Sequence, residues 1–179
     1  ATADNYTMNG VSASQDGQYH CIISNGCGTD TTQNAVVTVQ DTITISKQPT
    51  DTTACEDEPV EFSVNASGSG ISYQWERNTG SGWGAVSGET NSTYSIASLD
   101  PADQGDYRVI ITGACETDTS NVASLTVNNL ISITQQPNDT TVCEGDTVNL
   151  ESSATGSAPI SYQWETDASG SWSDISGAT

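Results

Sequence analysis

The stretch LDPADQGDYRV, residues 99–109, decides the fold. It places an Asp and a Gly in a tight turn, followed by Tyr107 two residues before an inward strand position. In a two-layer β-sandwich this arrangement joins two strands, buries the Tyr ring and lets its hydroxyl bond back to the turn. The same device stands 88 residues earlier, as QDGQYHC at residues 15–21. The chain is therefore a repeat, and its other motifs fall in that register.

The repeat covers the whole chain. Matched pairs at an offset of 88 include Tyr6–Tyr94, Val11–Leu99, Cys27–Cys115 and Cys55–Cys143, and after one inserted residue Trp75–Trp164 and Trp83–Trp172 stand at an offset of 89. We expect three segments: residues 1–40 as the last strands of one domain, 41–128 as a complete domain, and 129–179 as the first strands of another.

The complete domain shows the alternation that a half-buried strand requires. Expected strands run over residues 42–47, 51–55, 60–66, 71–77, 83–86, 94–99, 107–111 and 123–127. Expected inward positions are Val60, Phe62, Val64, Ala66, Trp75, Tyr94, Ile96, Leu99, Tyr107, Val109, Ile111, Ala123, Leu125 and Val127. No stretch carries a helical period, so the fold class is all-β.

The charge excludes several functions. Asp and Glu number 23 against three Lys and Arg, for a net charge of -20. Binding to nucleic acid requires clustered basic side chains, and docking on anionic lipid requires a basic surface, so neither fits this chain. No apolar run approaches the ~20 residues that span a bilayer.

These motifs resemble a known family. The combination of Gln48-Pro49, Cys55, the 60–64 alternation, Tyr73-Gln74-Trp75 and the 103–107 turn looks like a bacterial I-set-type immunoglobulin domain. It is similar to the Ig-like repeats of large surface proteins and adhesins exported by type IX secretion. The resemblance implies tandem sandwiches, with residues 1–40 as strands E–G and residues 129–179 as strands A–C'. The family's usual core disulfide positions hold Val64 and Val109 here.

Five cysteines occur, and none forms a CxxC motif. Cys27 and Cys115 fall in F–G turns, whereas Cys55 and Cys143 fall just before A'–B turns. About ten strand residues at ~3.3 Å each separate the two ends of a sandwich, too far for a disulfide within one domain. In a stacked array those ends face each other, so we expect Cys55 to pair with Cys27 of the next period and Cys115 with Cys143 of the preceding one. The alternative is free or heterogeneous thiols.

Cys21 stands apart, at an inward F-strand position whose B-strand counterpart is Ser152. We expect a buried free thiol there. Disulfides elsewhere would place the chain outside the cytoplasm.

Oxygen-bearing side chains gather near the expected domain junctions. Candidate calcium ligands are Asp41, Asp51, Asn128, Asn129 and Asp139. No EF-hand spacing is present, and the alternative is a solvated acidic surface. No other cofactor is expected.

Asp-Thr followed by an apolar residue or Thr resembles the O-glycosylation motif of bacteria with type IX secretion. The candidate acceptors are Thr31, Thr42, Thr52, Thr140 and Thr147. In a Thr-rich chain such triplets also arise by chance.

Four aromatic residues are expected to be structural. Trp75 and Trp164 should lie in sandwich cores, and Tyr19 and Tyr107 should form tyrosine corners. No catalytic motif is present: His20 is the only histidine and falls on an outward strand position.

The expected function is structural: an extracellular, non-enzymatic stalk, filament or adhesin segment on a bacterial surface, with neighbouring Ig-like repeats or identical subunits joined head to tail. Short junctions should stiffen it, because no flexible spacer separates the domains. One period measures 177 residues and the chain is two longer, which fits a segment of a longer array. The rival interpretation is a subunit whose half-domains complete those of its neighbours. Alternative functions are a protein- or carbohydrate-binding module and a spacer of a secreted enzyme.

Overall fold

The computed structural model describes residues 4–168 and 170–178. The chain divides into two compact units. One comprises Ala1–Thr50, Phe62–Tyr94 and Asp106–Ala123, and the other comprises Asp51–Glu61, Ser95–Gly105 and Ser124–Thr179. The described residues are β-strands and loops with two short 3-10 helices, which confirms the all-β fold class.

The first unit begins with the amino-terminal segment. Its elements are the 3-10 helix η1 (Ala13–Gln15) and the strands β1 (Gly17–Tyr19), β2 (Ile22–Asn25), β3 (Gly28–Thr31) and β4 (Ala35–Val37). β1 pairs antiparallel with β4, and β2 forms a hairpin with β3. The predicted tyrosine corner is confirmed here, because the Tyr19 hydroxyl donates to the Gln15 carbonyl at 2.7 Å.

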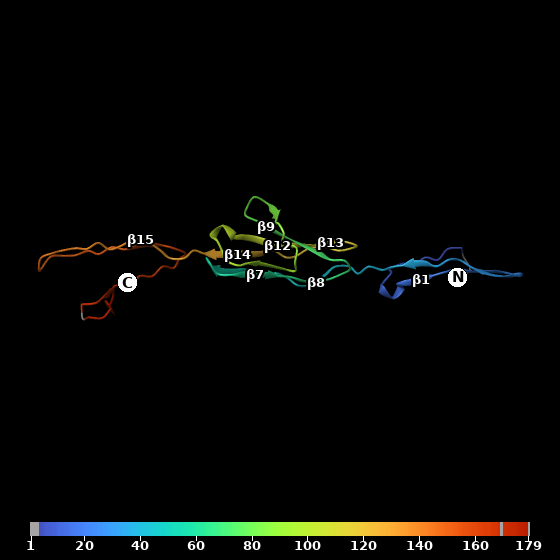
Figure 1. Cartoon of the computed structure of the whole chain (residues 1–179), viewed down its shortest axis with the longest axis horizontal. Coiled ribbons are helices and arrows are strands. Elements are labelled where there is room, and N and C mark those ends of the chain that lie inside the picture. The colour runs from blue at the N-terminus through green and yellow to red at the C-terminus, as the bar shows by residue number, and fades with distance from the viewer. Residues whose placement is uncertain (1–3, 169, 179) are drawn as a thin grey trace. The chain divides into compact units, whose positions relative to one another are not determined.

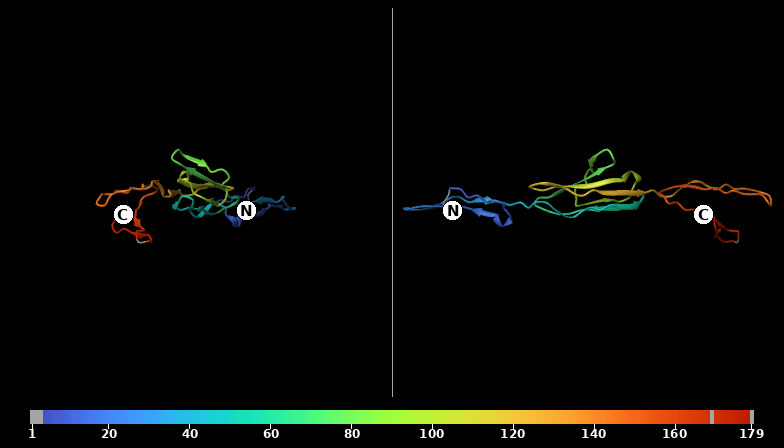
Figure 2. Two further views of the ribbon diagram at one scale, coloured as in Figure 1. Left: turned by 60° about the vertical axis from the view of Figure 1, so that its left-hand side comes forward. Right: turned by 180° about the vertical axis from the view of Figure 1, so that it is seen from behind.

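The strands of the central domain form two layers (Figures 1 and 2). One layer contains β9 (Ser72–Asn78), β10 (Trp83–Ala85), β12 (Gly105–Thr112) and β13 (Thr117–Thr119), in the pairs β10–β9, β9–β12 and β12–β13. The other contains the pairs β5 (Thr44–Lys47) with β8 (Asn65–Ser67), and β7 (Val60–Ser63) with β11 (Thr93–Ile96).

Aromatic rings fill the space between these layers. Phe62 stacks on Tyr107 at 5.0 Å between ring centroids and lies 6.2 Å from Trp75. The Trp75 indole N–H donates to the Asn91 carbonyl at 2.9 Å. Phe62, Trp75 and Tyr107 are at most 1% exposed, so the predicted core positions of these strands are confirmed.

The second unit contains the remaining strands. They are β6 (Thr52–Cys55), β14 (Ala123–Asn128), β15 (Ser132–Gln135), β16 (Ser153–Thr155), β17 (Glu165–Thr166) and β18 (Ser173–Asp174), with the 3-10 helix η2 (Pro101–Asp103). β14 pairs with β6 in parallel, whereas β15–β16 and β17–β18 are antiparallel pairs. Leu99 is buried, and its N–H donates to the Glu58 carbonyl at 3.0 Å.

Several expected strands are absent from the described terminal segments. No strand forms around Tyr6, where strand E was expected. Residues 140–143, 148–151 and 160–164 likewise lie outside the strands, although strands A', B and C were expected there. Each of these strands lacks its hydrogen-bond partner within its own segment, and a strand without a partner leaves its N–H and C=O groups to solvent.

Burial differs from expectation at the same ends of the chain. Cys21 is exposed rather than buried. Trp164 and Tyr19 are only half-buried, although Trp164 was expected in a core. The cause is the same: within each terminal segment no opposing sheet covers the inward face.

Candidate functional site

The linker at residues 40–43 is hydrogen-bonded to the loop between β8 and β9. The Asp41 N–H donates to Ser69 Oγ at 2.8 Å, and the Ser69 N–H donates to the Asp41 carbonyl at 3.2 Å. Gly68 allows this approach: at φ +152°, a Cβ there would meet the Thr42 carbonyl oxygen at 3.2 Å. A side chain at position 68 would therefore push the linker away.

The turn that carries Cys115 also contacts this linker. The Ile43 N–H donates to the Glu116 carboxylate at 2.7 Å. The Cys115 thiol donates to the Gln40 carbonyl at 3.9 Å, a long and weak contact. The F–G turn of the central domain therefore lies against the linker that precedes the domain.

The linker at residues 128–131 is held in the same way, by a serine that exchanges two hydrogen bonds with one linker residue. We call this arrangement the serine clamp. The Asn129 N–H donates to Ser157 Oγ at 2.8 Å, and the Ser157 N–H donates to the Asn129 carbonyl at 3.2 Å. Gly156, at φ +157°, would place a Cβ 3.2 Å from the Leu130 carbonyl oxygen. The Gly-Ser pairs at 68–69 and 156–157 stand 88 residues apart, so both junctions are built in the same way.

The turn beside Cys55 contacts this second linker from the preceding domain. The Glu56 N–H donates to the Asn128 carbonyl at 2.8 Å, and the Glu56 carboxylate accepts the Leu130 N–H at 3.2 Å. Asn128 is the repeat counterpart of Gln40. The carbonyl at this position of the linker is therefore contacted at both junctions. At Gln40 it is contacted by the Cys115 turn, which belongs to the domain after the linker. At Asn128 it is contacted by the turn beside Cys55, which belongs to the domain before the linker.

The sequence placed Glu56 near a junction but did not indicate Ser69, Ser157 or Glu116 as junction residues. The available signal was the Gly-Ser pair recurring at an offset of 88. Glu56 also recurs at this offset, as Glu144, whereas Glu116 carried no such signal because Gly28 stands at its counterpart position.

All five cysteines are free and exposed within the single chain. Cys55 and Cys143 share a local arrangement, in which the backbone N–H donates to a carboxylate three residues on: that of Glu58 at 2.9 Å and that of Asp146 at 3.0 Å. The Cys27 N–H donates to Asn25 Oδ1 at 2.8 Å in the β2–β3 turn. The predicted pairings join different copies of the repeat and remain predictions.

The calcium candidates are not assembled into one site. The Asp51 carboxylate accepts the Ser124 N–H at 2.8 Å, and Asp41, Asn128 and Asn129 use backbone groups in the linker contacts. Asp139 is exposed. In residues 4–168 and 170–178, no three His, Cys, Asp or Glu side chains gather as a metal site would require. Junctional calcium therefore remains a prediction without a formed site.

The candidate glycosylation acceptors lie at accessible positions. Thr31, Thr42, Thr140 and Thr147 are exposed, and Thr52 on β6 is half-buried. The Asp30 carboxylate accepts the Thr31 N–H at 2.8 Å, a local role for the Asp of that triplet. Modification remains a prediction at all five.

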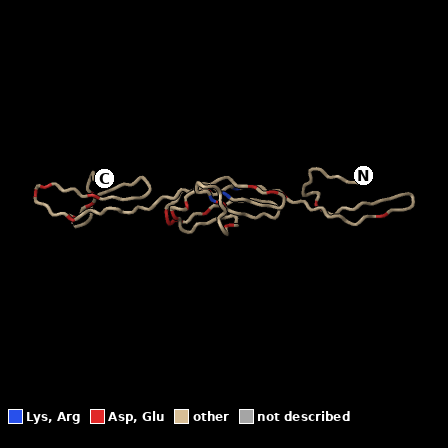
Figure 3. Tube along the Cα trace, turned by 90° about the horizontal axis from the view of Figure 1, so that it is seen from above, with Lys and Arg blue, Asp and Glu red and all other residues tan. Residues whose placement is uncertain are grey.

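An ion pair covers part of the outer face of the central domain. The Arg108 guanidinium lies 2.8 Å from the Glu76 carboxylate and 4.1 Å from the Trp83 ring centroid. Trp83 is therefore half-buried by structural contacts. The three basic residues of the chain lie in residues 41–128, whereas acidic residues occur in all three segments (Figure 3).

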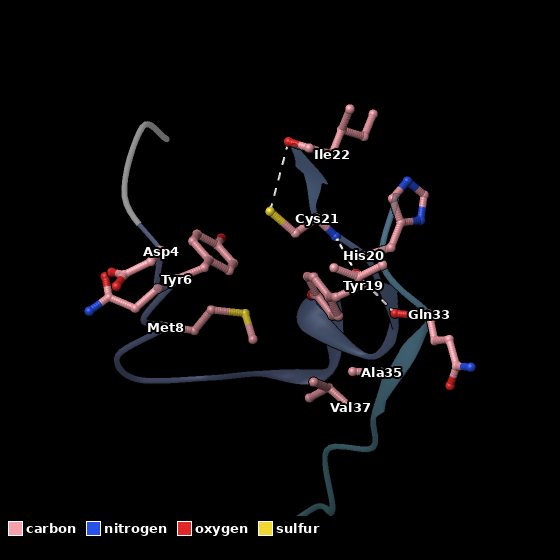
Figure 4. Close-up of a pocket in the computed structure, with 12 residues that line it drawn as sticks. Asp4, Tyr6, Met8, Tyr19, His20, Cys21, Ile22, Gln33, Ala35 and Val37 are labelled. Carbon is pink, nitrogen blue, oxygen red and sulfur yellow. Dashed lines mark hydrogen bonds between the residues drawn. The ribbon is translucent and has the colours of Figure 1, made fainter. Parts of the chain in front are cut away.

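A hollow of about 770 Å³ lies on the inward face of the amino-terminal segment. Tyr6, Met8 and Tyr19 converge on it, whereas His20 and Gln33 point away (Figure 4). A smaller hollow of about 360 Å³ lies beside Leu150, Tyr162 and Trp164 in the carboxyl-terminal segment. Each hollow lies at positions whose repeat counterparts in residues 41–128 include core residues.

Comparisons with known proteins support the fold. Residues 43–129 match a family described as a domain of unknown function, DUF8696. No curated protein sequence matches the chain.

Similar solved structures are Ig-domain proteins. The N-terminal eight Ig domains of DSCAM isoform 1.30.30 give a TM-score of 0.50 at 23% identity, over 82% of this chain and 21% of that chain. The N-terminal four Ig domains of Dscam1 isoform 6.9 give 0.50 at 22% identity, over 65% and 28%. Dpr2 Ig1-Ig2 in complex with DIP-Theta Ig1-Ig3 gives 0.50 at 22% identity, over 69% and 44%. The fold is immunoglobulin-like. The chain spans less than half the length of each of these three structures.

Proposed function

We propose that the chain is a non-enzymatic structural segment of an extracellular array of immunoglobulin-like domains, stiffened by short hydrogen-bonded junctions and covalently stapled between neighbouring domains. The bacterial surface setting of this proposal, as a stalk, filament or adhesin, rests on the resemblance of the repeat motifs. Within the described residues, no helix is both long and apolar enough to cross a bilayer.

The junctions carry the proposal. Both linkers are held by the same Gly-Ser clamp, and glutamates from the adjoining turns accept linker N–H groups. Hydrogen bonds to ionised groups contribute about 1.5–3 kcal/mol when shielded and less when exposed. A junction with several such bonds resists bending more than a free linker of the same length.

The position of the cysteines supports the staple. The Cys115 thiol and the residue after Cys55 each reach the same carbonyl of the linker repeat, at Gln40 and at Asn128. In a continuous array both turns therefore converge on one linker, one from each side. Cys55 would then bond Cys27 of the next period, and Cys115 would bond Cys143 of the preceding one.

The test is peptide mapping by mass spectrometry under reducing and non-reducing conditions. Cross-linked peptides that join the Cys55 and Cys27 regions, and the Cys115 and Cys143 regions, are expected from oxidised native protein. A Cys21→Ser variant is the matched control and should leave those cross-links intact. All thiols free under oxidising conditions, or a bridge between Cys55 and Cys115, would overturn the stapled array.

A further inference from the structure

Asparagine followed by glycine occurs twice in the chain, at Asn9-Gly10 and at Asn25-Gly26. This dipeptide is chemically labile, because the backbone nitrogen after an Asn can attack the side-chain amide carbon. Gly has no Cβ, so it leaves that nitrogen open and the backbone free to turn. The two sites share this chemistry, and a difference in their reactivity must come from their surroundings in the fold.

Asn9 lies in a loop in which nothing fixes its side chain. Asn9 and Gly10 are both exposed and lie outside the strands. Among the residues that the structure describes, neither takes part in a hydrogen bond. Gly10 has a φ of +62°, and a Cβ added to it would meet no atom within 4 Å. The side-chain amide of Asn9 and the backbone nitrogen of Gly10 are therefore free to approach each other.

The same position of the repeat is exposed in the central domain. The counterparts of Asn9 and Gly10 there are Ala97 and Ser98, which directly follow β11. Both are exposed, although the core of the central domain is covered. The accessibility of Asn9 is therefore a property of the loop before the tyrosine corner and does not follow from the uncovered inward face.

Asn25, by contrast, is held by the turn of the β2–β3 hairpin. Its Oδ1 accepts the Cys27 N–H at 2.8 Å and the Gly28 N–H at 3.1 Å. Asn25 and Gly28 also stand opposite each other as the last pair of the hairpin. Both strands lie within residues 22–31, so this arrangement is local. The amide group that the nitrogen would attack is therefore fixed to the turn.

Ring closure requires a change of backbone conformation that the two sites accommodate differently. The cyclic imide joins the Gly backbone nitrogen to the Asn Cγ, and it forms only when that nitrogen swings towards the side chain. Asn9 can turn in this way within its loop. At Asn25 the same rotation breaks both hydrogen bonds to Oδ1 and disturbs the pairing with Gly28. The hairpin therefore opposes the reaction.

We propose that Asn9 is a site of spontaneous deamidation in the folded chain, whereas the turn protects Asn25. This inference goes beyond the proposed array and does not depend on it. Hydroxide removes the proton from the Gly10 nitrogen, which attacks the Asn9 Cγ. The N–Cγ bond forms, the Cγ–Nδ2 bond breaks, and ammonia leaves with a proton from water. Water then opens the cyclic imide to Asp or isoaspartate, so the net reaction consumes water and releases ammonia.

The product changes the surface of the loop and leaves the tyrosine corner in place. Deamidation adds a negative charge to a chain whose net charge is already -20. Isoaspartate also routes the main chain through the former side chain, which lengthens the loop. The corner bond between the Tyr19 hydroxyl and the Gln15 carbonyl lies beyond this loop and depends on a local turn. We therefore expect that bond to persist in the deamidated chain.

The test follows both sites in one sample of the folded chain. The chain is incubated in a mildly alkaline reducing buffer, which keeps Cys27 as a thiol, and samples are mapped by mass spectrometry over time. Chymotryptic peptides separate the two sites, because Tyr19 lies between them. Deamidation is read from the mass gain when an amide NH2 is replaced by OH, and isoaspartate from electron-transfer fragmentation.

The expected result is deamidation at Asn9 and a rate at Asn25 that is about 10- to 100-fold lower, because two hydrogen bonds must open there before attack. In concentrated urea the two rates should converge, since the hairpin is lost. Gly10→Ala should slow the reaction at Asn9, because the added methyl hinders the attacking nitrogen. The matched control is Gly26→Ala, which should leave the rate at Asn9 unchanged.

Other outcomes overturn the inference. An Asn9 that reacts no faster than Asn25 in the folded chain excludes a labile loop. A difference that persists undiminished in urea shows that the neighbouring residues, and not the fold, set the rates. A Gly26→Ala variant that slows Asn9 as much as Gly10→Ala does excludes attack by the Gly10 nitrogen. The reducing buffer separates this test from the disulfide mapping, so either proposal can fail while the other stands.

Discussion

The central domain and the amino-terminal segment carry the same repeat but show different degrees of order. β12 runs unbroken over Gly105–Thr112, whereas its counterpart is divided into β1 and β2. Tyr107 is fully buried, and Tyr19 is half-buried although its hydroxyl makes the tyrosine-corner bond. The difference teaches that the turn and its Tyr are local features, whereas strand continuity and burial require the opposing strands.

The largest expected effect comes from truncating one aromatic residue of the covered core. Phe62→Ala should lower the free energy of unfolding by about 3–5 kcal/mol, because it removes a buried ring stacked on Tyr107. Leu150→Ala, at the repeat counterpart, should change it by less than about 0.5 kcal/mol, because Leu150 is 49% exposed. Urea denaturation of both variants measures the difference. Equal losses would mean that the carboxyl-terminal half already has a covered core.

Substitution of the two junction glycines, Gly68 and Gly156, should give the next largest effect. Gly68→Ala should cost about 2–3 kcal/mol, because its φ of +152° disfavours a side chain and the added Cβ would meet Ile71 at 3.1 Å. Gly156→Ala should loosen β15 and β16 without changing the unfolding of the central domain. Amide hydrogen exchange separates these two outcomes.

Gly70→Ala is the control for backbone conformation alone. Gly70 has a φ of +63°, and the nearest atom to an added Cβ, that of Ala114, lies at 4.0 Å. It should cost about 1 kcal/mol. A Gly68→Ala cost no larger than this would show that the approach of the linker is unimportant.

The serine clamps give a smaller effect that is confined to one amide each. Ser69→Ala removes the acceptor of the Asp41 N–H, and Ser157→Ala removes that of the Asn129 N–H. Each loss should weaken local protection by about 0.5–1.5 kcal/mol, up to about tenfold in exchange rate. Exchange measured by NMR should change at the matched amide only. A change at both amides in either variant would contradict two independent clamps.

The smallest effect is expected on the outer face. Arg108→Lys should cost at most about 1 kcal/mol, since it loses the planar contact with Trp83 and the contact of two guanidinium nitrogens with Glu76 in a partly exposed setting. His20 is the repeat counterpart of Arg108. His20→Arg should leave the free energy of unfolding unchanged within about 0.5 kcal/mol. Thermal denaturation at low and high salt checks both. A loss for Arg108→Lys that does not shrink at high salt would point to packing rather than charge.

Much of the central domain was predictable because its signals are local. The alternation over residues 60–64 predicted that Val60, Phe62 and Val64 are buried, and the structure confirms all three. The junction contacts were not predictable. Glu116 reaches Ile43 across 73 residues of sequence, and Glu56 reaches Leu130 across 74. Nothing in the pattern around either glutamate indicates that its carboxylate accepts a backbone N–H so distant in sequence.

The sequence by itself determined the alternation of side chains, the turn chemistry and the repeat register, because these depend on neighbours along the chain. Tertiary structure alone decided which inward positions are covered, which strands form and which carboxylates hold the linkers. Hydrogen-bond partners and burial come from segments far away in sequence, so Ile23 and Ile111 can share one pattern while one is 61% exposed and the other fully buried.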